Sequence, residues 1–598
     1  MIRRLFHAVL VAVFVAAISF LSACEASEQA SAEEVVTDVE WFRDAKFGMF
    51  IHWGMSSQLG GIWDGKRYYG ITEWLMRRAK IPSAEYKAKS VEFNPVEYDA
   101  AEWVAVAKAA GVRYIVITAK HHDGFAMFDS AVSDFDIVDA TPYGEDPLKA
   151  LTEEARKAGI RIGFYYSQYQ DWTEKDAAGN EWEFDPDDRN FDRYLAEKAM
   201  PQLEELLTNY GPIDIIWFDT PGDLSKENAE QLRAWVKELQ PNCLVSDRIG
   251  HDLGDYKGYN DGEIPAVAEG ERPWEAIFTH NDSWGFSYFD YNFKSTSEVL
   301  ELLISTVSKG GNLMLNIGPD GLGRIPAPSA ATFRSVGEWL KVNGEAVYGT
   351  SASPLGKVPW GGITARPGKL YLHVLHPPAD GMLILPGLAT EPDAARVLAT
   401  GEKLKVRRDG GDIFVELPAS EGSSVPVVAV DLAADTAIEV DDATAVSARY
   451  DGARLQFEDL DGGDAELAKY RTMHYFGDWK HYHTVGGLTS PANSATWNLR
   501  VLEPGTYKIV LNYSASKEQA GQEGVLTIAG RDFYFKVLET GELSEGEAFS
   551  PRKPLMFLDH PVAVVHFDQA GDYELTVRPE VANTSLAKLL FVDIRLHD

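Results

Sequence analysis

Residues 211–222, GPIDIIWFDTPG, are a short apolar run that ends in a carboxylate. The isoleucines, Trp217 and Phe218 favour burial, whereas a buried charge on Asp219 is costly unless it is paired. A helical pattern follows in residues 225–239, SKENAEQLRAWVKEL. A buried strand followed by an amphipathic helix is the repeating unit of an α/β fold. Asp219 is then either a turn residue before Thr-Pro-Gly or a polar group at the mouth of a sheet.

The same strand-then-helix pattern recurs over residues 40–350. Strand-like runs occupy 47–54, 114–122, 160–167, 214–219, 243–247, 275–279 and 312–318. Helical patterns occupy 97–110, 146–158, 190–209, 225–239 and 296–309, and a helix is missing from 249–273. The strand-like runs are continuously apolar, as is typical of parallel strands that are covered on both faces.

This alternation predicts an α/β protein with a (β/α)8-like TIM barrel, and the alternative is a doubly wound sheet. The first strand is not followed by a Gly-rich dinucleotide loop, which favours the barrel. We place the barrel at residues 39–350. Short strands separated by turns then predict two all-β sandwich domains, at 351–438 and 439–598. The second is jelly-roll-like, and carbohydrate binding is a hypothesis for it.

The N-terminus has the features of an export signal. Residues 1–24 contain two arginines, an apolar stretch and the ending Leu-Ser-Ala-Cys, which resembles a bacterial lipoprotein box at Cys24. A plain transmembrane anchor is the alternative, but the apolar run is short for a bilayer span. Residues 25–38 are small and acidic and indicate a linker. We therefore expect an exported protein, a periplasmic or outer-membrane (cell-surface) lipoprotein of a bacterium, whose contact with the membrane is the lipid anchor at Cys24.

Composition limits the partners. The chain has 598 residues and a formal net charge of −35, from 91 acidic and 56 basic residues. Such a charge argues against nucleic acid and anionic membrane surfaces as ligands. Cys24 and Cys243 are the two cysteines of the sequence, so it predicts neither a disulfide framework nor a cysteine-based metal site.

Polar and ionisable residues stand at the carboxyl ends of several predicted strands. These residues are His52, His121, His122, Tyr165, Asp219 and Arg248. Barrel enzymes place their active sites at this end of the strands, so the pattern predicts one shared pocket. The adjacent histidines could ligate a metal. However, neighbouring strand residues face opposite ways and no HExxH motif is present, so we predict no metal and no cofactor.

Six segments carry a resemblance to a known family. They are KFGMFIHWG (46–54), TAKHHDGFAMFDS (118–130), GFYYS (163–167), IIWFD (215–219), SWGF (283–286) and NLMLNIGPDGLGRIP (312–326). In this order they resemble the α-L-fucosidases of glycoside hydrolase family 29. The resemblance covers about residues 40–430, and residues 439–598 lie outside it.

The resemblance implies roles for individual residues. Asp219 corresponds to the family's nucleophile. The implied sugar contacts are His52, Glu73, Trp74, His121, His122, Tyr165, Trp217, Arg248 and Trp284. Thr72 stands where the family usually has the Gly of its Gly-Glu-Trp element. The ring of Trp284 would suit the apolar C6 methyl group of fucose.

The second catalytic carboxyl group, the acid/base, is the least defined residue. A retaining mechanism needs it about 5–5.5 Å from the nucleophile. Glu263 lies in the helix-poor connection that follows a strand, which favours it. Glu275 is second because it begins a strand and so points to the opposite end of the barrel. Asp261 is third.

We therefore predict a retaining α-L-fucosidase that removes terminal α-linked L-fucose from a fucosylated oligosaccharide or polysaccharide. Two alternatives remain open at this point. One is a related exo-glycosidase of the galactoside type, and the other is a non-catalytic carbohydrate-binding surface protein. The sequence does not indicate an oligomeric state.

Overall fold

The structure is a computed structural model that describes residues 38–268, 270–418, 425–433, 438–440, 443–474, 478–541, 555–583 and 585–597. The expected signal at 1–24 lies outside the described residues, as does the expected linker at 25–38 except for Asp38. Residues Val39–Asp598 form one compact unit.

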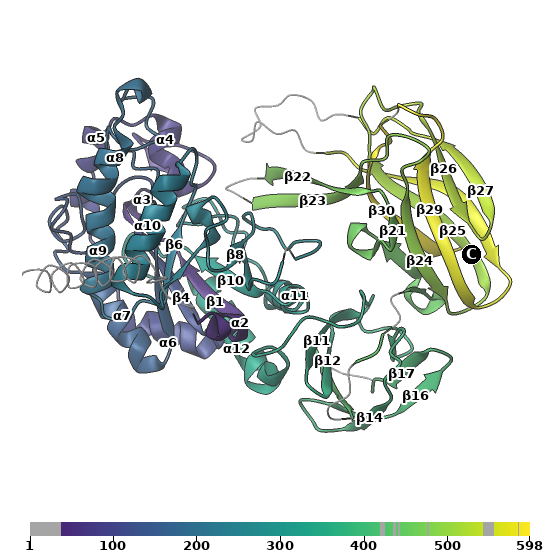
Figure 1. The fold of residues 1–598 in the computed structure, drawn as a ribbon. Helices are drawn as coiled ribbons and strands as arrows, with labels where there is room; N and C mark the ends of the chain where they lie inside the picture. Colours follow the sequence, from purple (N-terminus) through teal and green to yellow (C-terminus); the bar gives the residue numbers. More distant parts are fainter. Residues whose placement is uncertain are drawn as a thin grey trace, which may run out of the picture. The chain divides into compact units, whose positions relative to one another are not determined.

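Eight parallel strands form the first sheet (Figure 1). They are β1 (Phe47–Ile51), β4 (Tyr114–Lys120), β5 (Arg161–Tyr166), β6 (Ile215–Phe218), β7 (Leu244–Val245), β8 (Lys257–Gly258), β9 (Trp274–Thr279) and β10 (Asn312–Ile317). Their order is β7-β6-β5-β4-β1-β10-β9-β8. A parallel bridge between Ser246 and Tyr256 joins the two edge strands. The predicted TIM-like barrel is confirmed, and the doubly wound alternative is not.

Helices follow most of these strands (Figure 1). They are α6 (Ala100–Ala110), α7 (Pro147–Ala158), α8 (Phe191–Tyr194), α9 (Met200–Thr208), α10 (Lys226–Leu239), α11 (Thr296–Val307) and α12 (Ala327–Asn343). Local signals set their ends: the Asp99 carboxylate accepts the Ala101 and Glu102 amides at the start of α6, and Gly111 ends this helix in the left-handed conformation. A π-turn at Leu195–Ala199 joins α8 to α9 within the helix predicted at 190–209.

Shorter elements occupy the remainder of the barrel's chain. Before β4 these are α2 (Glu40–Ala45), α3 (Met55–Leu59), β2 (Ile62–Trp63), β3 (Lys66–Arg67), a 3₁₀ turn at Thr72–Trp74, α4 (Leu75–Ala79) and α5 (Ser83–Lys87). The helix-poor stretch 249–273 holds the short strand β8, which the sequence pattern did not identify. Its described residues contain no α-helix, so this connection is a long loop at the catalytic end of the barrel.

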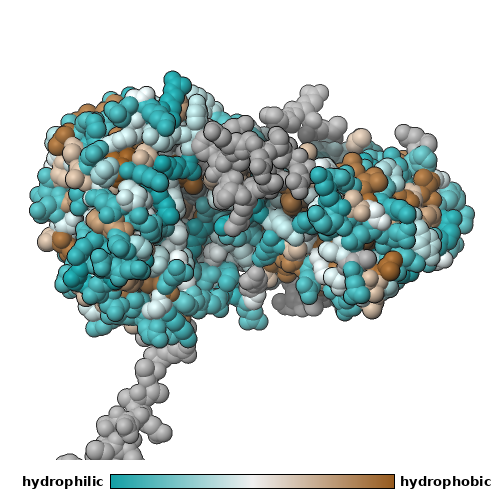
Figure 2. Space-filling model, turned by 90° about the horizontal axis from the view of Figure 1, so that it is seen from above, coloured by the Kyte–Doolittle hydropathy of each residue, from teal (hydrophilic) through white to brown (hydrophobic). Residues whose placement is uncertain are grey.

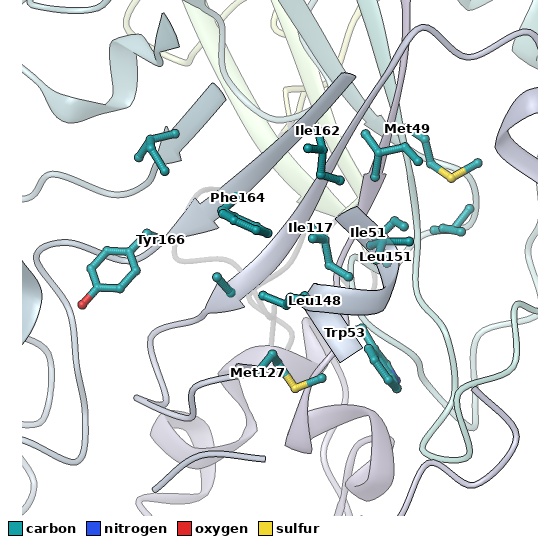
Figure 3. Packing of buried hydrophobic residues seen from close by; sticks show 14 of the residues in the cluster. Met49, Ile51, Trp53, Ile117, Met127, Leu148, Leu151, Ile162, Phe164 and Tyr166 are labelled. Carbon is teal, nitrogen blue, oxygen red and sulfur yellow. The ribbon is translucent and has the colours of Figure 1, made fainter. Parts of the chain in front are cut away.

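Apolar side chains fill the space between the strands and the surrounding helices. Figure 3 shows Leu148 and Leu151 of α7 beside Ile117 of β4 and Phe164 of β5. All four are at most 1% exposed. The continuous apolar runs of the sequence are explained by this burial on both faces of the sheet.

Two groups of β-sheets follow the barrel. The first has β11 (Gly361–Arg366), β12 (Lys369–Val374), β18 (Val427–Leu432), β14 (Pro392–Val397) and β15 (Lys403–Leu404) in one sheet, and β13 (Met382–Leu385), β17 (Asp412–Glu416) and β16 (Val406–Asp409) in another. Their shared core includes Trp360 and Leu372. This alternation of short strands fits the pattern expected for a sandwich.

The second group also has two sheets. One contains β19 (Thr444–Val446), β21 (Gly462–Gly463), β24 (Ala495–Val501), β26 (Glu523–Ile528), β27 (Arg531–Lys536) and β29 (Gly571–Pro579). The other contains β20 (Gly452–Leu455), β22 (Glu466–His474), β23 (Asp478–Gly486), β25 (Gly505–Ser514), β28 (Leu558–Phe567) and β30 (Lys588–Leu596). Trp497 and Tyr507 are fully buried in their common core. The hairpin of β22 and β23 pairs over its whole length, from Glu466–Gly486 to His474–Asp478.

The face seen in Figure 2 is mainly hydrophilic, with hydrophobic residues in scattered positions. This agrees with the acidic composition, because exposed carboxylates keep such a protein soluble. None of the helices in the described part of the chain has the length and apolar character that a membrane crossing requires.

The packing of α6 on α12 generates the first prediction. A β-carbon on Gly337 would lie 1.7 Å from the carbonyl oxygen of Ala109 and 2.8 Å from the Cα of Ala110. Gly337→Ala should therefore lower the stability of the barrel by about 1–3 kcal/mol, although alanine favours helix. Thermal unfolding midpoints measure the effect. Gly356→Ala is the control, because a β-carbon there meets no atom within 4 Å; equal losses in both variants would contradict the prediction.

Candidate active site

The carboxyl ends of the barrel strands bring the predicted polar residues together. His52 follows β1, His121 follows β4, Tyr165 lies in β5, and Asp219 follows β6. Arg248 comes from the 3₁₀ turn Asp247–Ile249 after β7. Parallel strands present these positions at the same end of the barrel. The structure thus assembles a constellation that is spread over almost 200 residues of sequence.

A cavity of about 240 Å³ opens among these residues. Of the nine predicted sugar contacts, all except His122 line it: His52, Glu73, Trp74, His121, Tyr165, Trp217, Arg248 and Trp284. Asp219 also lines it. The cavity is smaller than the clefts of 300–1,000 Å³ that hold drug-sized ligands, and its size suits one small ring.

Asp219 is 9% exposed and is paired on both carboxylate oxygens. Arg248 Nη1 donates to Oδ1 at 2.9 Å, and the Tyr165 hydroxyl donates to Oδ2 at 2.9 Å. Burial by itself raises the pKa of Asp219, but the charge and hydrogen bond of Arg248, with the Tyr165 bond, lower the pKa below the usual value. Asp219 is therefore an ionised carboxylate in a nearly dry site, and the turn-residue alternative does not hold.

One guanidinium group joins two carboxylates. Arg248 Nη2 donates to Oδ1 of Asp261 at 2.5 Å while Nη1 holds Asp219. Its position is fixed by a further bond from Nη2 to the Tyr259 carbonyl at 3.1 Å and by the Trp217 ring, 4.9 Å away. The planar fork of arginine suits such a double contact. Asp219 and Asp261 consequently face the same cavity within the span of a single side chain.

The histidines beside Asp219 are neutral. His52 Nδ1 donates to Asn316 Oδ1 at 2.7 Å, and burial lowers its pKa to about 4. Burial also lowers the pKa values of His121 and His122 well below the usual value. His122 Nδ1 donates to Ser167 Oγ at 2.6 Å, and its Nε2 lies 3.6 Å from Asp219 Oδ2. Neutral imidazoles can both donate to and accept from sugar hydroxyls.

The two adjacent histidines do not point to opposite faces as the strand alternation predicted. β4 ends at Lys120, so His121 and His122 lie in the turn that follows, and their ring centroids are 4.3 Å apart. Among the described residues, no group of three or more His, Cys, Asp or Glu side chains is arranged to hold a metal ion.

Aromatic and aliphatic side chains form the remaining walls. Tyr165 stacks on Trp217 with 5.5 Å between ring centroids, and Trp284 lies 5.1 Å from His52. Trp284 is 6% exposed. Phe50 and Ile277 add apolar surface to the same cavity. This combination of stacked rings and polar groups fits a ligand that has both hydroxyl groups and an apolar edge.

Glu73 is a buried carboxyl group in the cavity wall, 4% exposed. Its Oε1 accepts the Gly285 amide, and no described group hydrogen-bonds to Oε2. Burial raises the pKa of Glu73 to about 8, against the smaller opposing effects of a backbone hydrogen bond and Arg78. The group is therefore protonated at neutral pH and can donate one hydrogen bond into the cavity.

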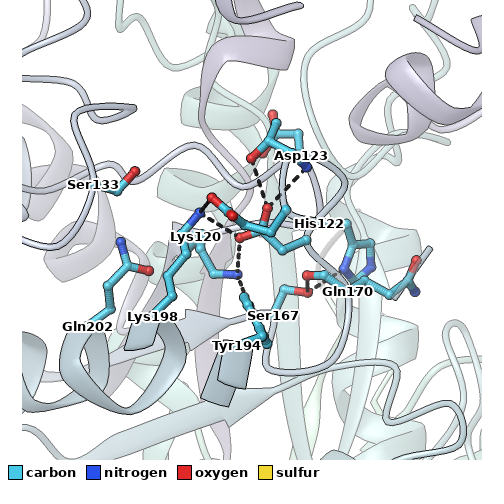
Figure 4. Close-up of polar contacts among 12 residues, drawn as sticks. Lys120, His122, Asp123, Ser133, Ser167, Gln170, Tyr194, Lys198 and Gln202 are labelled. Atoms are coloured by element: carbon cyan, nitrogen blue, oxygen red, sulfur yellow. Dashed lines mark hydrogen bonds and ion pairs between the residues drawn. The ribbon is translucent and has the colours of Figure 1, made fainter. Parts of the chain in front are cut away.

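A buried polar network supports the turn after β4 (Figure 4). Lys120 Nζ donates to Asp171 Oδ2 at 3.2 Å and to the Tyr194 hydroxyl at 2.9 Å, while Lys198 Nζ lies 2.9 Å from the same Asp171 oxygen. Burial lowers the pKa of Lys120 to about 8. Gly124, at φ +78°, passes so close that a β-carbon would lie 2.2 Å from Asp171 Oδ1. These contacts hold the histidine turn in one position.

The two predicted acid/base residues lie outside the cavity lining. Glu275, 1% exposed, accepts the Tyr114 hydroxyl at 2.7 Å and Trp217 Nε1 at 3.0 Å, beneath the cavity, and burial raises its pKa to about 7. Glu263, also 1% exposed, is bonded to Asn260 and His483. Asp261, the third choice, lines the cavity. Of the three candidates, Asp261 is thus the one whose side chain lines the cavity with Asp219.

Other lining residues were not identified from the sequence. Asn260 belongs to the long loop after β8, and Arg471 and Trp479 come from the β22–β23 hairpin. No local sequence pattern distinguishes Arg471 and Trp479, because they reach the cavity through the packing of a hairpin that is far from the barrel in the sequence. Thr220 also lines the cavity, with φ at 43° directly before Pro221. A β-branched residue in the left-handed region is strained, and such strain concentrates at functional sites.

A second and larger cavity, of about 760 Å³, lies elsewhere in the described part of the chain. Its lining includes Lys309, Glu458 and Asp459. Lys309 and Glu458 are paired at 3.3 Å. The smaller cavity has the convergent carboxylates, the arginine and the aromatic rings, so the chemistry points there rather than to the larger space.

Comparisons with known proteins agree with this site. The family model described as alpha-L-fucosidase matches residues 19–345. Tissue alpha-L-fucosidase of Rattus norvegicus is 31% identical over 58% of this chain and 78% of its own length. The alpha-L-fucosidase of Vibrio sp. strain EJY3 superposes with a TM-score of 0.75 at 30% identity, over 93% of this chain and 97% of that one.

A further solved structure bears on mechanism. It is an alpha-L-fucosidase of Bacteroides thetaiotaomicron trapped as a covalent intermediate with 2-fluoro-fucosyl fluoride. It superposes with a TM-score of 0.61 at 30% identity and covers 66% of this chain and 96% of its own. The Vibrio relative extends over the sandwich region as well, whereas the Bacteroides relative covers a smaller share of the chain.

The raised pKa of Glu73 predicts a pH-dependent stability. The folded pKa of about 8 exceeds the usual glutamate value, so the folded state binds more protons than the unfolded state between about pH 4.3 and 8. The free energy of unfolding should therefore fall as pH rises through this window, by up to about 1.4 kcal/mol per pH unit. Glu73→Gln removes this contribution and should lose less stability over the same range.

Thermal midpoints of the wild type and Glu73→Gln across this pH window measure the difference. Glu275 contributes equally to both proteins and cancels in the comparison. Glu85→Gln, at an exposed glutamate, is the control. Parallel curves for wild type and Glu73→Gln would show that Glu73 does not hold an extra proton.

Proposed function

This chain belongs to the alpha-L-fucosidase family, and we propose that it hydrolyses terminal α-linked L-fucose from glycans with retention of the anomeric configuration. It is a glycoside hydrolase with a TIM-like barrel. The observation that carries the mechanism is the Arg248 fork, which holds Asp219 and Asp261 at one small cavity. A pair of carboxyl groups flanking the scissile bond is what glycoside hydrolysis requires.

Asp219 is the proposed nucleophile. It is ionised, it lines the cavity, and its pKa is lowered by Arg248 and Tyr165 against the effect of burial. A carboxylate in this state can attack the anomeric carbon once a sugar ring is positioned above it. The Bacteroides relative, trapped as a covalent intermediate, gives a precedent for such attack in a similar protein.

Asp261 is the proposed acid/base. It is the other aspartate that lines the cavity beside Arg248, whereas Glu263 and Glu275 use their carboxylates in buried bonds away from it. Its loop follows β8 and opens at the catalytic end of the barrel. Position, and not residue type, is the reason to prefer this aspartate to the two glutamates.

The reaction then has two steps. Asp219 attacks the anomeric carbon while Asp261 gives its proton to the departing glycosidic oxygen, so an ester of fucose forms and the rest of the glycan leaves as an alcohol. A water next gives a proton to Asp261 and its oxygen attacks the anomeric carbon, which frees Asp219 as a carboxylate. Two inversions give net retention. Arg248 balances the negative charge that moves between the two aspartates.

The cavity walls support fucose over the galactoside alternative. Trp284, Phe50 and Ile277 supply apolar surface, which suits a C6 methyl group better than a hydroxymethyl group. Glu73, His52 and His121 supply hydrogen bonds for ring hydroxyls. The pair of carboxyl groups argues against a purely sugar-binding protein, because binding alone needs no second acid.

Export and anchoring are proposed from the sequence of residues 1–24, which lie outside the described residues. The basic start, the short apolar stretch and Cys24 support a lipoprotein of the periplasm or cell surface. The fucosylated substrate would then be an extracellular glycan.

The nucleophile assignment predicts that Asp219→Ala lowers turnover of an aryl α-L-fucoside by at least about a thousandfold, because no covalent intermediate can form. Asp223→Ala, at a nearby exposed aspartate, should keep its activity. Mass mapping of the wild type after reaction with a 2-fluoro-fucosyl fluoride should place the label on Asp219. A label on another residue, or activity in a folded Asp219→Ala variant, would overturn the assignment. Faster turnover of an aryl β-D-galactoside would instead support the galactoside alternative.

The acid/base assignment predicts a distinct response to azide. Asp261→Ala should hydrolyse α-L-fucosyl fluoride far better than a fucosyl disaccharide, because fluoride leaves without a proton. Azide should raise its turnover of an activated fucoside and give α-L-fucosyl azide, since azide intercepts the ester that water can no longer open. The same product from Glu263→Ala or Glu275→Ala, and not from Asp261→Ala, would transfer the role to that glutamate.

A further inference from the structure

A hairpin from the second group of β-sheets reaches the catalytic cavity. Arg471 of β22 and Trp479 of β23 line the cavity together with Asp219 and Asp261. Both residues lie more than 120 residues beyond the match to the family model, which ends at residue 345. The chemistry of the barrel therefore shares its cavity with a segment that the family match does not include.

The hairpin contacts the loop that carries Asp261. Arg471 Nη1 donates to Asn260 Oδ1 at 3.1 Å, and His481 Nε2 donates to the Asp261 carbonyl at 2.8 Å. Gly262, at φ +71°, packs tightly on the hairpin, because a β-carbon would lie 3.0 Å from the Trp479 carbonyl oxygen. The loop and the hairpin thus fit closely along three consecutive residues.

Glu263 secures this contact. Its carboxylate accepts His483 Nε2 at 3.0 Å and Asn260 Nδ2 at 2.5 Å, and Lys469 Nζ lies 3.9 Å away. It is 1% exposed. Burial alone would raise the pKa of Glu263, but the hydrogen bonds of His483 and Asn260 lower it to about 2. Glu263 is thus a positioning residue that keeps the loop against the hairpin as an ionised, fully paired group.

The side chains that face the cavity suit a sugar. Arg471 lies over the Trp479 ring at 4.8 Å, which braces the indole. Trp479 is partly exposed, so its ring is available to a ligand in the cavity. A rigid aromatic surface beside an arginine and the Asn260 amide offers stacking together with hydrogen bonds, which is the combination that a saccharide ring requires.

We propose that the β22–β23 hairpin completes the leaving-group subsite, in which Trp479 stacks on the sugar that carries the fucose. This inference rests on the proposed function, because the leaving oxygen must lie beside Asp261, and the hairpin borders Asp261. The preferred substrate is then a fucosyl oligosaccharide rather than a fucoside with a small leaving group. Trp479 and Arg471 are specificity-determining residues that contribute nothing to the attack by Asp219.

Two substrates separate the subsite from the chemistry. An α-L-fucosyl disaccharide fills the leaving-group subsite, and α-L-fucosyl fluoride leaves it empty. Trp479→Ala should lower kcat/KM for the disaccharide by about five- to tenfold, as expected for the loss of one aromatic contact. The loss of kcat/KM for the fluoride should be markedly smaller than the loss for the disaccharide. Trp479→Phe should restore most of the disaccharide activity.

Tyr534→Ala is the matched control, since Tyr534 is an exposed aromatic residue, 66% exposed, of the same group of sheets. It should change neither activity. An unchanged disaccharide activity in Trp479→Ala, or an equal loss on both substrates, would overturn the subsite. A wild type that turns over neither substrate would instead refute the proposed function, so the two failures are distinguishable.

Discussion

The active site depends on one partly buried arginine that holds two aspartate side chains. Asp219 and Asp261 line the same small cavity, and an unpaired negative charge there would be costly on whichever of the two carries it during the reaction. The Arg248 guanidinium offsets this cost because its two terminal nitrogens each hold one carboxylate, at 2.9 and 2.5 Å. It also sets their relative position. The proposed reaction therefore depends on Arg248, which lies in the turn after β7, as well as on Asp219.

The two aspartates that Arg248 holds are supported in different ways. Asp219, the proposed nucleophile, follows a barrel strand and contacts Tyr165 and His122, so its position is fixed by the barrel core. Asp261 sits in a connection whose described residues lack an α-helix. Such a loop needs external support, which Glu263 and the β22–β23 hairpin provide. Catalytic groups must be held to within a fraction of an ångström, so this support is part of the active site's construction.

The sequence indicates the barrel and the nucleophile's side because both depend on local patterns. Apolar runs predict the strands, and polar groups at their ends, such as His52 and Asp219, predict the pocket. β8 is too short to leave a pattern. The choice of acid/base depends on packing: the sequence favours Glu263 by its place in the chain, whereas the structure shows Glu263 and Glu275 in buried bonds with other residues and Asp261 in the cavity wall. Trp479 could not be found at all, since its role depends on packing across more than 200 residues.

The barrel and the β22–β23 hairpin supply different parts of the cavity wall, so they should affect different properties of the enzyme. The residues that we propose to contact fucose all come from the barrel, so substitutions there should alter the chemistry and the sugar recognised. The leaving-group side is bordered by Trp479 and Arg471, whose strands take no part in the barrel sheet. Substitutions in the hairpin can therefore change the preferred neighbour of fucose without disturbing the Arg248 pairing. Selectivity and catalysis are separable here because different sheets supply them, and the Asp261 loop is the one segment that both must share.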